Sequence, residues 1–211
     1  MTCFLRNLFF AGLALIFLYL SSGVAAAETR VLMLGDSLTA GLGVMPDQAW
    51  PALVQKKLDE TGGARARTVR IINGGISGST SASAPSRVKW YLKSPPDILV
   101  LALGANDGLR GLSVEQMRQN LDRAIQMATA AGIRVILAGM QIPPNLGPDY
   151  TTAFAQVFPD LAAAHDLALI PFLLKGVAGH PELNQADGVH PNVPGHRIIA
   201  DTVFSYIQEA L

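Results

Sequence analysis

The segment VLMLGDSL, residues 31–38, joins a run of four apolar residues to a Gly-Asp-Ser turn. A short apolar run that ends in turn residues is typical of a buried strand, and the residues that follow Ser37 read as the start of a helix. In open parallel sheets, ligands bind beyond the carboxyl ends of the strands, next to the amides of the following helix. Ser37 is therefore a candidate nucleophile, although serine is also a common turn residue and helix cap.

Along the rest of the chain, apolar runs alternate with amphipathic stretches, as in βα units with a parallel sheet. The run at residues 98–103 is apolar on both faces, which predicts a strand in the middle of the sheet. The proline-rich segment 141–150 is expected to form a loop at the same sheet edge as Ser37. We expect strands at residues 30–34, 69–73, 98–103, 134–138 and 168–172, and helices at 50–60, 85–93, 114–131, 152–165 and from 194 onward.

Residues 1–27 have the pattern of a cleaved signal peptide: a positive charge at Arg6, an apolar stretch over 8–20 and small residues at 25–27. The apolar stretch is short for a membrane span, and a retained N-terminal anchor is the alternative. We expect a single mature domain, residues 28–211, that is periplasmic or secreted and keeps no stable membrane anchor after signal cleavage.

Composition excludes several kinds of site. The only cysteine, Cys3, lies within the predicted signal peptide, so the mature chain would have no disulfide, no cysteine nucleophile and no thiolate metal ligand. The chain carries 16 Lys and Arg residues against 16 Asp and Glu residues, which leaves no basic field to attract nucleic acid.

Polar residues follow several of the predicted strands and would meet at one sheet edge. A serine hydroxyl needs an adjacent base, and His190 is the best candidate, with Asp187 three residues earlier to orient its ring. An Asp-x-x-His pair is also compatible with metal binding or with a purely structural role. The backbone amide of Gly78 and the side-chain amide of Asn106 could hold a developing oxyanion. Together these residue types suit acyl transfer.

Five sequence blocks resemble, in this order, those of the SGNH or GDSL hydrolases, and most closely the branch of periplasmic thioesterases, lysophospholipases and arylesterases. The resemblance spans nearly all of the predicted mature chain. Two blocks differ from the usual pattern: Ala105 precedes Asn106 where a second glycine is common, and Ser79 follows Gly78 where an acidic residue is common. The blocks are GDSLTAG at 35–41, AWPAL at 49–53, NGGISGST at 73–80, GANDGLRG at 104–111 and DGVHPN at 187–192.

The resemblance implies a flavodoxin-like α/β/α sandwich of three layers, with a five-stranded parallel sheet in the order 2-1-3-4-5. It implies a catalytic triad of Ser37, Asp187 and His190, and an oxyanion hole formed by the amides of Ser37 and Gly78 and the side chain of Asn106. It implies no metal and no cofactor. It also places an acyl groove beside residues after the third and fourth strands, where the candidate substrate-binding residues are Leu109, Ile142, Pro143 and Asn145.

The expected function is that of a serine hydrolase that cleaves thioesters and carboxylic esters of acyl chains, lysophospholipids among them, through an acyl-enzyme. A carbohydrate O-acetyl esterase is the alternative within the same class. A non-catalytic flavodoxin-like ligand-binding module is the alternative from another class, but the sequence has no glycine-rich phosphate fingerprint with an acidic partner. We expect the protein to be a monomer.

Overall fold

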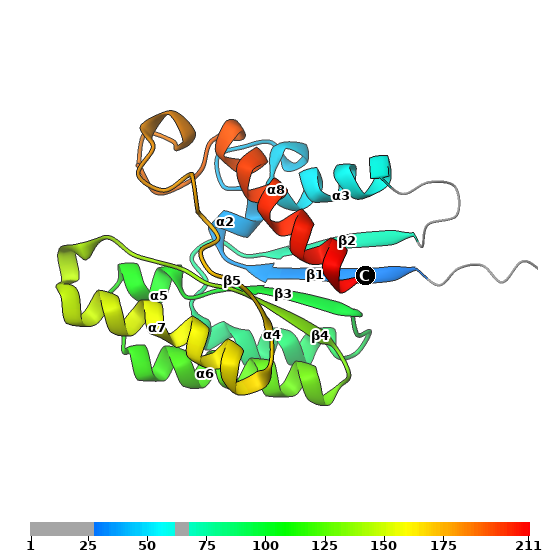
Figure 1. Ribbon diagram of the computed structural model, residues 1–211, viewed down its shortest axis with the longest axis horizontal. Helices are drawn as coiled ribbons and strands as arrows, with labels where there is room; N and C mark the ends of the chain where they lie inside the picture. Colours follow the sequence, from blue (N-terminus) through cyan, green and yellow to red (C-terminus); the bar gives the residue numbers. More distant parts are fainter. Residues whose placement is uncertain (1–27, 62–67) are drawn as a thin grey trace, which may run out of the picture.

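The computed structural model describes residues 28–61 and 68–211, so the predicted signal peptide lies outside the described residues. At its centre is a five-stranded parallel sheet in the order β2-β1-β3-β4-β5 (Figure 1), as predicted. The strands are β1 (Thr29–Gly35), β2 (Val69–Gly75), β3 (Ile98–Ala102), β4 (Arg134–Ala138) and β5 (Ala168–Ile170).

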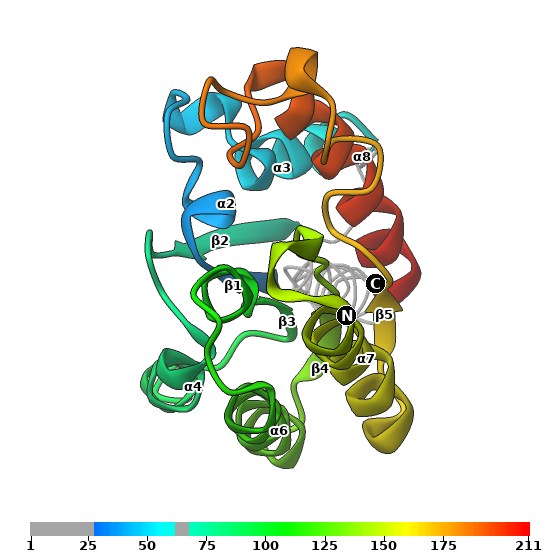
Figure 2. The same cartoon turned by 90° about the vertical axis from the view of Figure 1, so that its left-hand side faces the viewer.

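Helices cover both faces of the sheet, which confirms the three-layer architecture. The first face carries α3 (Trp50–Thr61) and α8 (Val193–Ala210), and Figure 2 shows them on the side opposite α4, α6 and α7. Every residue of β3 is buried, as expected for a central strand covered on both sides. The helices on the second face are α4 (Ala84–Tyr91), α6 (Val114–Ala130) and α7 (Pro148–His165).

Two short helices directly follow strands, and of these the sequence predicted only the start of the first. They are α2 (Ser37–Ala40) and α5 (Ala105–Leu109), and each is too short to show an apolar period. The last strand ends at Ile170 and not at residue 172, because Pro171 has no N–H to continue the ladder. These differences all lie at the carboxyl edge of the sheet.

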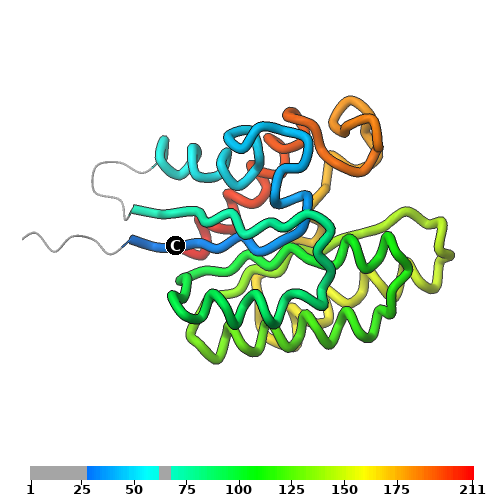
Figure 3. Tube along the Cα trace, turned by 180° about the vertical axis from the view of Figure 1, so that it is seen from behind, coloured from blue at the N-terminus to red at the C-terminus, as the bar shows by residue number. Residues whose placement is uncertain are grey.

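The prediction that residues 141–150 form only a loop is wrong. Pro144–Leu146 forms a 3₁₀ turn, and α7 begins at Pro148, with Gly147 as its N-cap. Proline is favoured at the first position of a helix because its missing N–H would have no partner there. Figure 3 shows the segments after β4 and β5 extending beyond the sheet at the end opposite the C-terminus.

Tight packing fixes the short helix α2 against the sheet. A Cβ on Gly75, at the end of β2, would lie 2.1 Å from the backbone nitrogen of Ala40, so only glycine lets α2 pack this closely. Trp50 is fully buried, and its Nε1 donates to the carbonyl of Leu38 over 2.9 Å. The position of Ser37, the first residue of α2, is therefore set by neighbours on several sides.

None of the described helices combines the length and the apolar character that a membrane crossing requires.

Candidate active site

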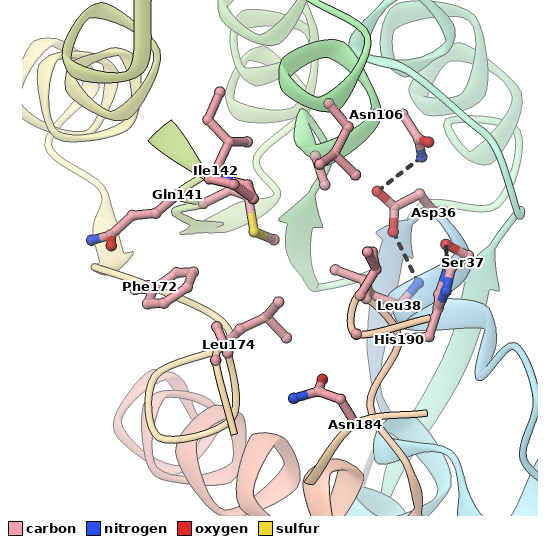
Figure 4. Close-up of a pocket in the computed structure, with 18 residues that line it drawn as sticks. Asp36, Ser37, Leu38, Asn106, Gln141, Ile142, Phe172, Leu174, Asn184 and His190 are labelled. Carbon is pink, nitrogen blue, oxygen red and sulfur yellow. Dashed lines mark hydrogen bonds between the residues drawn. The ribbon is translucent and has the colours of Figure 1, made fainter. Parts of the chain in front are cut away.

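A chain of hydrogen bonds joins Ser37, His190 and Asp187. The Oγ atom of Ser37 lies 2.8 Å from Nε2 of His190, and Nδ1 of His190 lies 2.7 Å from Oδ2 of Asp187 (Figure 4 shows the first pair). With Nδ1–H donating to the carboxylate, Nε2 is free to accept from the serine hydroxyl. The three residues come from the start of α2 and from the loop before α8, so the fold brings together groups 153 positions apart.

The ionised form of Asp187 is stabilised by hydrogen bonds within the turn that it begins. Its Oδ1 accepts hydrogen bonds from the backbone amides of Val189 and His190, each over 2.9 Å. The backbone hydrogen bond from His190, the bond from its ring and the amide of Val189 lower the pKa of Asp187 to about 2. The ring of His190 therefore faces a fixed negative charge at neutral pH.

The loop that carries this pair is anchored to the segment after α2. The backbone amide of Gln185 donates to the carbonyl of His190 over 2.7 Å, which closes the loop. The side-chain amide of Gln185 donates to the carbonyls of Leu42 and Pro191, over 2.6 and 3.0 Å. These bonds fix the imidazole relative to the helix that bears Ser37.

Asn106 lies in α5, at the wall of the same pocket. Its Nδ2 is 3.1 Å from the carbonyl of Ser79 and 3.4 Å from Oδ2 of Asp36. Asp36 is buried at 1% exposure, and this burial raises its pKa to about 6, although the amide of Leu38 and the charge of His190 act in the opposite direction. The side chain of Asn106 is thus placed beside the N-cap of the helix that carries Ser37.

Gly78 lies near Asn106 but outside the cavity lining. It is exposed, with a left-handed φ of 77°, and its carbonyl accepts from Arg110 over 3.2 Å. The carboxylate of Asp107 ties its loop to α5 by accepting from the backbone amide and the hydroxyl of Ser81, over 2.8 and 2.6 Å. These bonds hold the loop that contains Gly78 against helix α5, which carries Asn106.

A cavity of about 510 Å³ extends from Ser37 between the segments that follow β3, β4 and β5. Of the four predicted substrate-binding residues, Leu109, Ile142 and Pro143 line it. Asn145 does not, because it sits in the exposed 3₁₀ turn beyond Pro143. Gln141, in the proline-rich segment, also lines the cavity, together with residues that were not predicted although their position just after a strand could have revealed them: Met140, Phe172 and Leu174.

The other histidines have partners away from the nucleophile. His196 is buried, which lowers its pKa to about 4, and its Nδ1 accepts from the backbone amide of Trp50 over 3.3 Å. His165 pairs with Asp122 over 2.5 Å, and His180 pairs with Glu182 over 3.2 Å. Within residues 28–61 and 68–211, no group of three or more His, Cys, Asp or Glu side chains could hold a metal ion.

A buried serine at the edge of a parallel sheet, hydrogen-bonded to a carboxylate-oriented imidazole beside an apolar cavity, defines the class of serine hydrolases with an α/β/α fold. Residues 33–198 match the GDSL-like lipase/acylhydrolase family, and the chain belongs to that family. It is an ester-cleaving hydrolase. This finding disfavours the non-catalytic ligand-binding module. The carbohydrate O-acetyl esterase is another ester-cleaving hydrolase, and the names of the relatives do not favour it.

Similar proteins cover nearly the whole chain. Esterase TesA of Pseudomonas aeruginosa is 42% identical over 188 residues, which is 89% of this chain and 91% of the relative. Thioesterase 1/protease 1/lysophospholipase L1 of Escherichia coli K12 is 36% identical over 204 residues, 96% and 95% of the two chains. A crystal structure of TesA superposes with a TM-score of 0.81 at 40% identity, covering 87% of this chain and all of that one (100%).

A second solved structure is that of the psychrotrophic esterase EstA from Pseudoalteromonas, inhibited by monoethylphosphonate. It superposes with a TM-score of 0.80 at 33% identity, and the match covers 86% of this chain and 98% of that one.

Proposed function

We propose that this protein cleaves carboxylic esters and thioesters of acyl chains through an acyl-enzyme formed on Ser37. The observation that carries the proposal is the hydrogen-bonded chain Ser37–His190–Asp187, at 2.8 and 2.7 Å, beside an apolar cavity. The names of the relatives, which include an esterase and a thioesterase, support the same two bond types.

In the first half-reaction, Oγ of Ser37 attacks the acyl carbon while its proton passes to Nε2 of His190. The imidazolium then returns that proton to the leaving oxygen or sulfur as its bond to the acyl carbon breaks. In the second half-reaction, water attacks the acyl-enzyme by the same route and releases the acid. Asp187 stays ionised throughout, which its low pKa of about 2 favours, and keeps the ring in the Nδ1–H tautomer.

The oxyanion of each tetrahedral intermediate is proposed to bind the amides of Ser37 and Gly78 and the side chain of Asn106. The Nδ2 group of Asn106 donates over 3.1 Å, an ordinary length, to Ser79 and over 3.4 Å, which is long for a hydrogen bond, to Asp36. Catalytic donors are often loosely engaged until substrate arrives, so these bonds can be exchanged for one to the oxyanion.

Asn106→Ala is expected to lower kcat by about 10²- to 10³-fold, the usual loss for one oxyanion donor. The side chain is partly exposed, so its removal should change the melting temperature little. The measurement is steady-state hydrolysis of p-nitrophenyl octanoate at matched folded concentration, with a thermal melt of each protein. Near-normal turnover in the variant would remove Asn106 from the oxyanion hole.

The cavity favours an acyl chain over a small polar group. Leu109, Ile142 and Pro143 contribute to a wall that also includes Phe172 and Leu174. Each methylene removed from water in such a pocket contributes about 0.8 kcal/mol. The fourth predicted residue, Asn145, is proposed to border only the part of a substrate that extends beyond the cavity.

An acyl-length series tests this substrate class. We expect kcat/KM to rise at least tenfold from p-nitrophenyl acetate to the octanoate, because several methylenes enter the apolar cavity. Acetyl, octanoyl and palmitoyl thioesters assayed beside the matched esters measure the preference between sulfur and oxygen leaving groups. A strong preference for acetyl groups would instead support deacetylation of carbohydrates.

We also propose export to the periplasm or the medium, with cleavage of residues 1–27, and action as a monomer on small esters, lysophospholipids among them. Arg6, the apolar stretch and the small residues at 25–27 support export. The name of the Escherichia coli relative, lysophospholipase L1, supports the lysophospholipid.

A further inference from the structure

Asn184 is a buried polar side chain that the proposed reaction does not use. It lines the cavity, is only 7% exposed and lies in the loop that leads to His190. Its Nδ2 donates to the carbonyls of Val177 and His180, over 2.7 and 2.8 Å. Because a carbonyl can only accept a hydrogen bond, these two contacts fix the NH₂ end of the amide and therefore also the direction of Oδ1.

The Oδ1 atom of Asn184 faces the cavity without a hydrogen-bond donor from the described residues. In the described part of the chain, Thr39 Oγ1 is the one inaccessible side-chain polar atom that has no hydrogen-bond partner. The unpaired Oδ1 of Asn184 is therefore not fully inaccessible. Figure 4 shows the oxygen of Asn184 directed toward the middle of the pocket. A ligand in the cavity can thus reach a preformed acceptor.

The cavity lining that includes Asn184 also contains apolar side chains and two loosely packed glycines. A Cβ built on Gly179 or on Gly188 would meet nothing within 4 Å, so these positions of the lining are open. Leu174 and Phe172 supply only hydrocarbon to the cavity. A purely apolar ligand would displace water from Oδ1 and leave the carbonyl unpaired, which is unfavourable.

The backbone holds Asn184 in register with the catalytic loop. Asn184 pairs with Pro191 in an antiparallel bridge, and its carbonyl accepts from Nδ2 of Asn192 over 3.2 Å. His190 directly precedes Pro191, so the acceptor and the proposed base are parts of one small hairpin. Its position is therefore set before substrate binds, which favours recognition of a fixed point on the substrate.

The groups around Oδ1 of Asn184 favour an uncharged hydrogen-bond donor on the ligand over a charged one. The titratable groups in the lining are Asp36 and His190, and both lie at the Ser37 end. The uncharged amide oxygen of Asn184 cannot by itself offset the desolvation of an ammonium ion. Building on the proposed ester hydrolysis at Ser37, we infer that Oδ1 of Asn184 forms a specificity subsite that accepts a hydrogen bond from a hydroxyl group on the ester substrate.

The hydroxyl can belong to the alcohol or to the acyl chain, and two substrate pairs distinguish these sources. The first pair is 2-hydroxyethyl octanoate and 2-methoxyethyl octanoate; the second is ethyl 3-hydroxyoctanoate and ethyl 3-methoxyoctanoate. In the wild type, kcat/KM is expected to favour the hydroxyl compound by about 3- to 10-fold in at least one pair, as for one neutral hydrogen bond. In Asn184→Leu this ratio should fall to near one.

Gln141→Leu is the matched control, because it removes another amide from the cavity lining and should leave the hydroxyl-to-ether ratio unchanged. Asn184→Leu also loses the two bonds of Nδ2, but any general loss of activity affects both members of a pair and cancels in their ratio.

Three results would overturn the inference. The first is a hydroxyl-to-ether ratio of kcat/KM near one in both pairs for the wild type. The second is a preference for the hydroxyl compound that persists in Asn184→Leu. The third is a preference that disappears equally in Gln141→Leu. Failure of the proposed function looks different, since none of the four esters would then be hydrolysed and the subsite would fail with it.

Discussion

Ser37→Ala is expected to lower kcat for p-nitrophenyl octanoate by about five to six orders of magnitude, as in other enzymes that lose a serine nucleophile. Among the described residues, the side chain of Ser37 makes one hydrogen bond, the 2.8 Å contact with His190. Alanine is favoured within a helix, so α2 should persist in the variant. The measurement combines turnover at matched folded concentration with labelling by a fluorophosphonate probe, which reacts with an activated serine.

The control is Ser86→Ala, which alters an exposed serine in α4 whose hydroxyl donates to its own helix turn. Wild type and this control should both be labelled, whereas Ser37→Ala should not. Labelling of Ser37→Ala, or turnover within tenfold of the wild type, would show that another group is the nucleophile. Absence of label from the wild type would argue against an activated serine altogether.

Asp187→Asn should cost about four orders of magnitude in kcat, because this change traps His190 in the wrong tautomer. The backbone amides of Val189 and His190 both donate to Oδ1 of Asp187, so the carbonyl oxygen of the new asparagine would take that place. Its NH₂ group would then face Nδ1 of His190. The ring would have to accept at Nδ1 and carry its proton on Nε2, where it cannot act as base toward Ser37.

Asp187→Ala is expected to lose less activity than Asp187→Asn, because alanine does not force His190 into the wrong tautomer. Asp187 has a side-chain exposure of 48%, so water can enter the vacated space and accept from Nδ1–H of His190. Glu182→Gln, at the exposed pair with His180, is the matched control and should retain wild-type turnover. Equal losses in the two Asp187 variants would refute the tautomer argument, and a small loss in both would show that the carboxylate is dispensable.

Much of this architecture could be predicted because it depends on long, regular patterns. The apolar run of β3 and the spacing of apolar residues in α6 identify elements of the core, and the carboxyl edge of the sheet follows from the parallel order. The residues that approach one another there, Ser37, Asp187 and His190, sit in turns with a distinctive composition. Their types and order were therefore sufficient to predict that they meet.

The parts that escaped prediction depend on single contacts between distant segments. The start of a helix at Ser37 was expected, but the exact position of α2 depends on the close approach at Gly75 and on the bond from Trp50, neither of which leaves a periodic signal. The outward turn of Asn145 depends on how the chain enters α7. The Oδ1 atom of Asn184 is left as an acceptor toward the cavity because the carbonyls of Val177 and His180 occupy its amide hydrogens, which no local pattern encodes.

The C-terminus and the substrate cavity lie at opposite ends of the sheet, which has a practical consequence for immobilising this enzyme. Leu211 lies near the start of β4, where the guanidinium of Arg134 donates to the carbonyl of Ala210, at the opposite end of the sheet from the segments that enclose the cavity (Figures 1 and 3). A resin or carrier domain attached at Leu211 would hold the enzyme with its substrate entrance directed away from the support. An immobilised preparation made in this way would remain open to bulky esters.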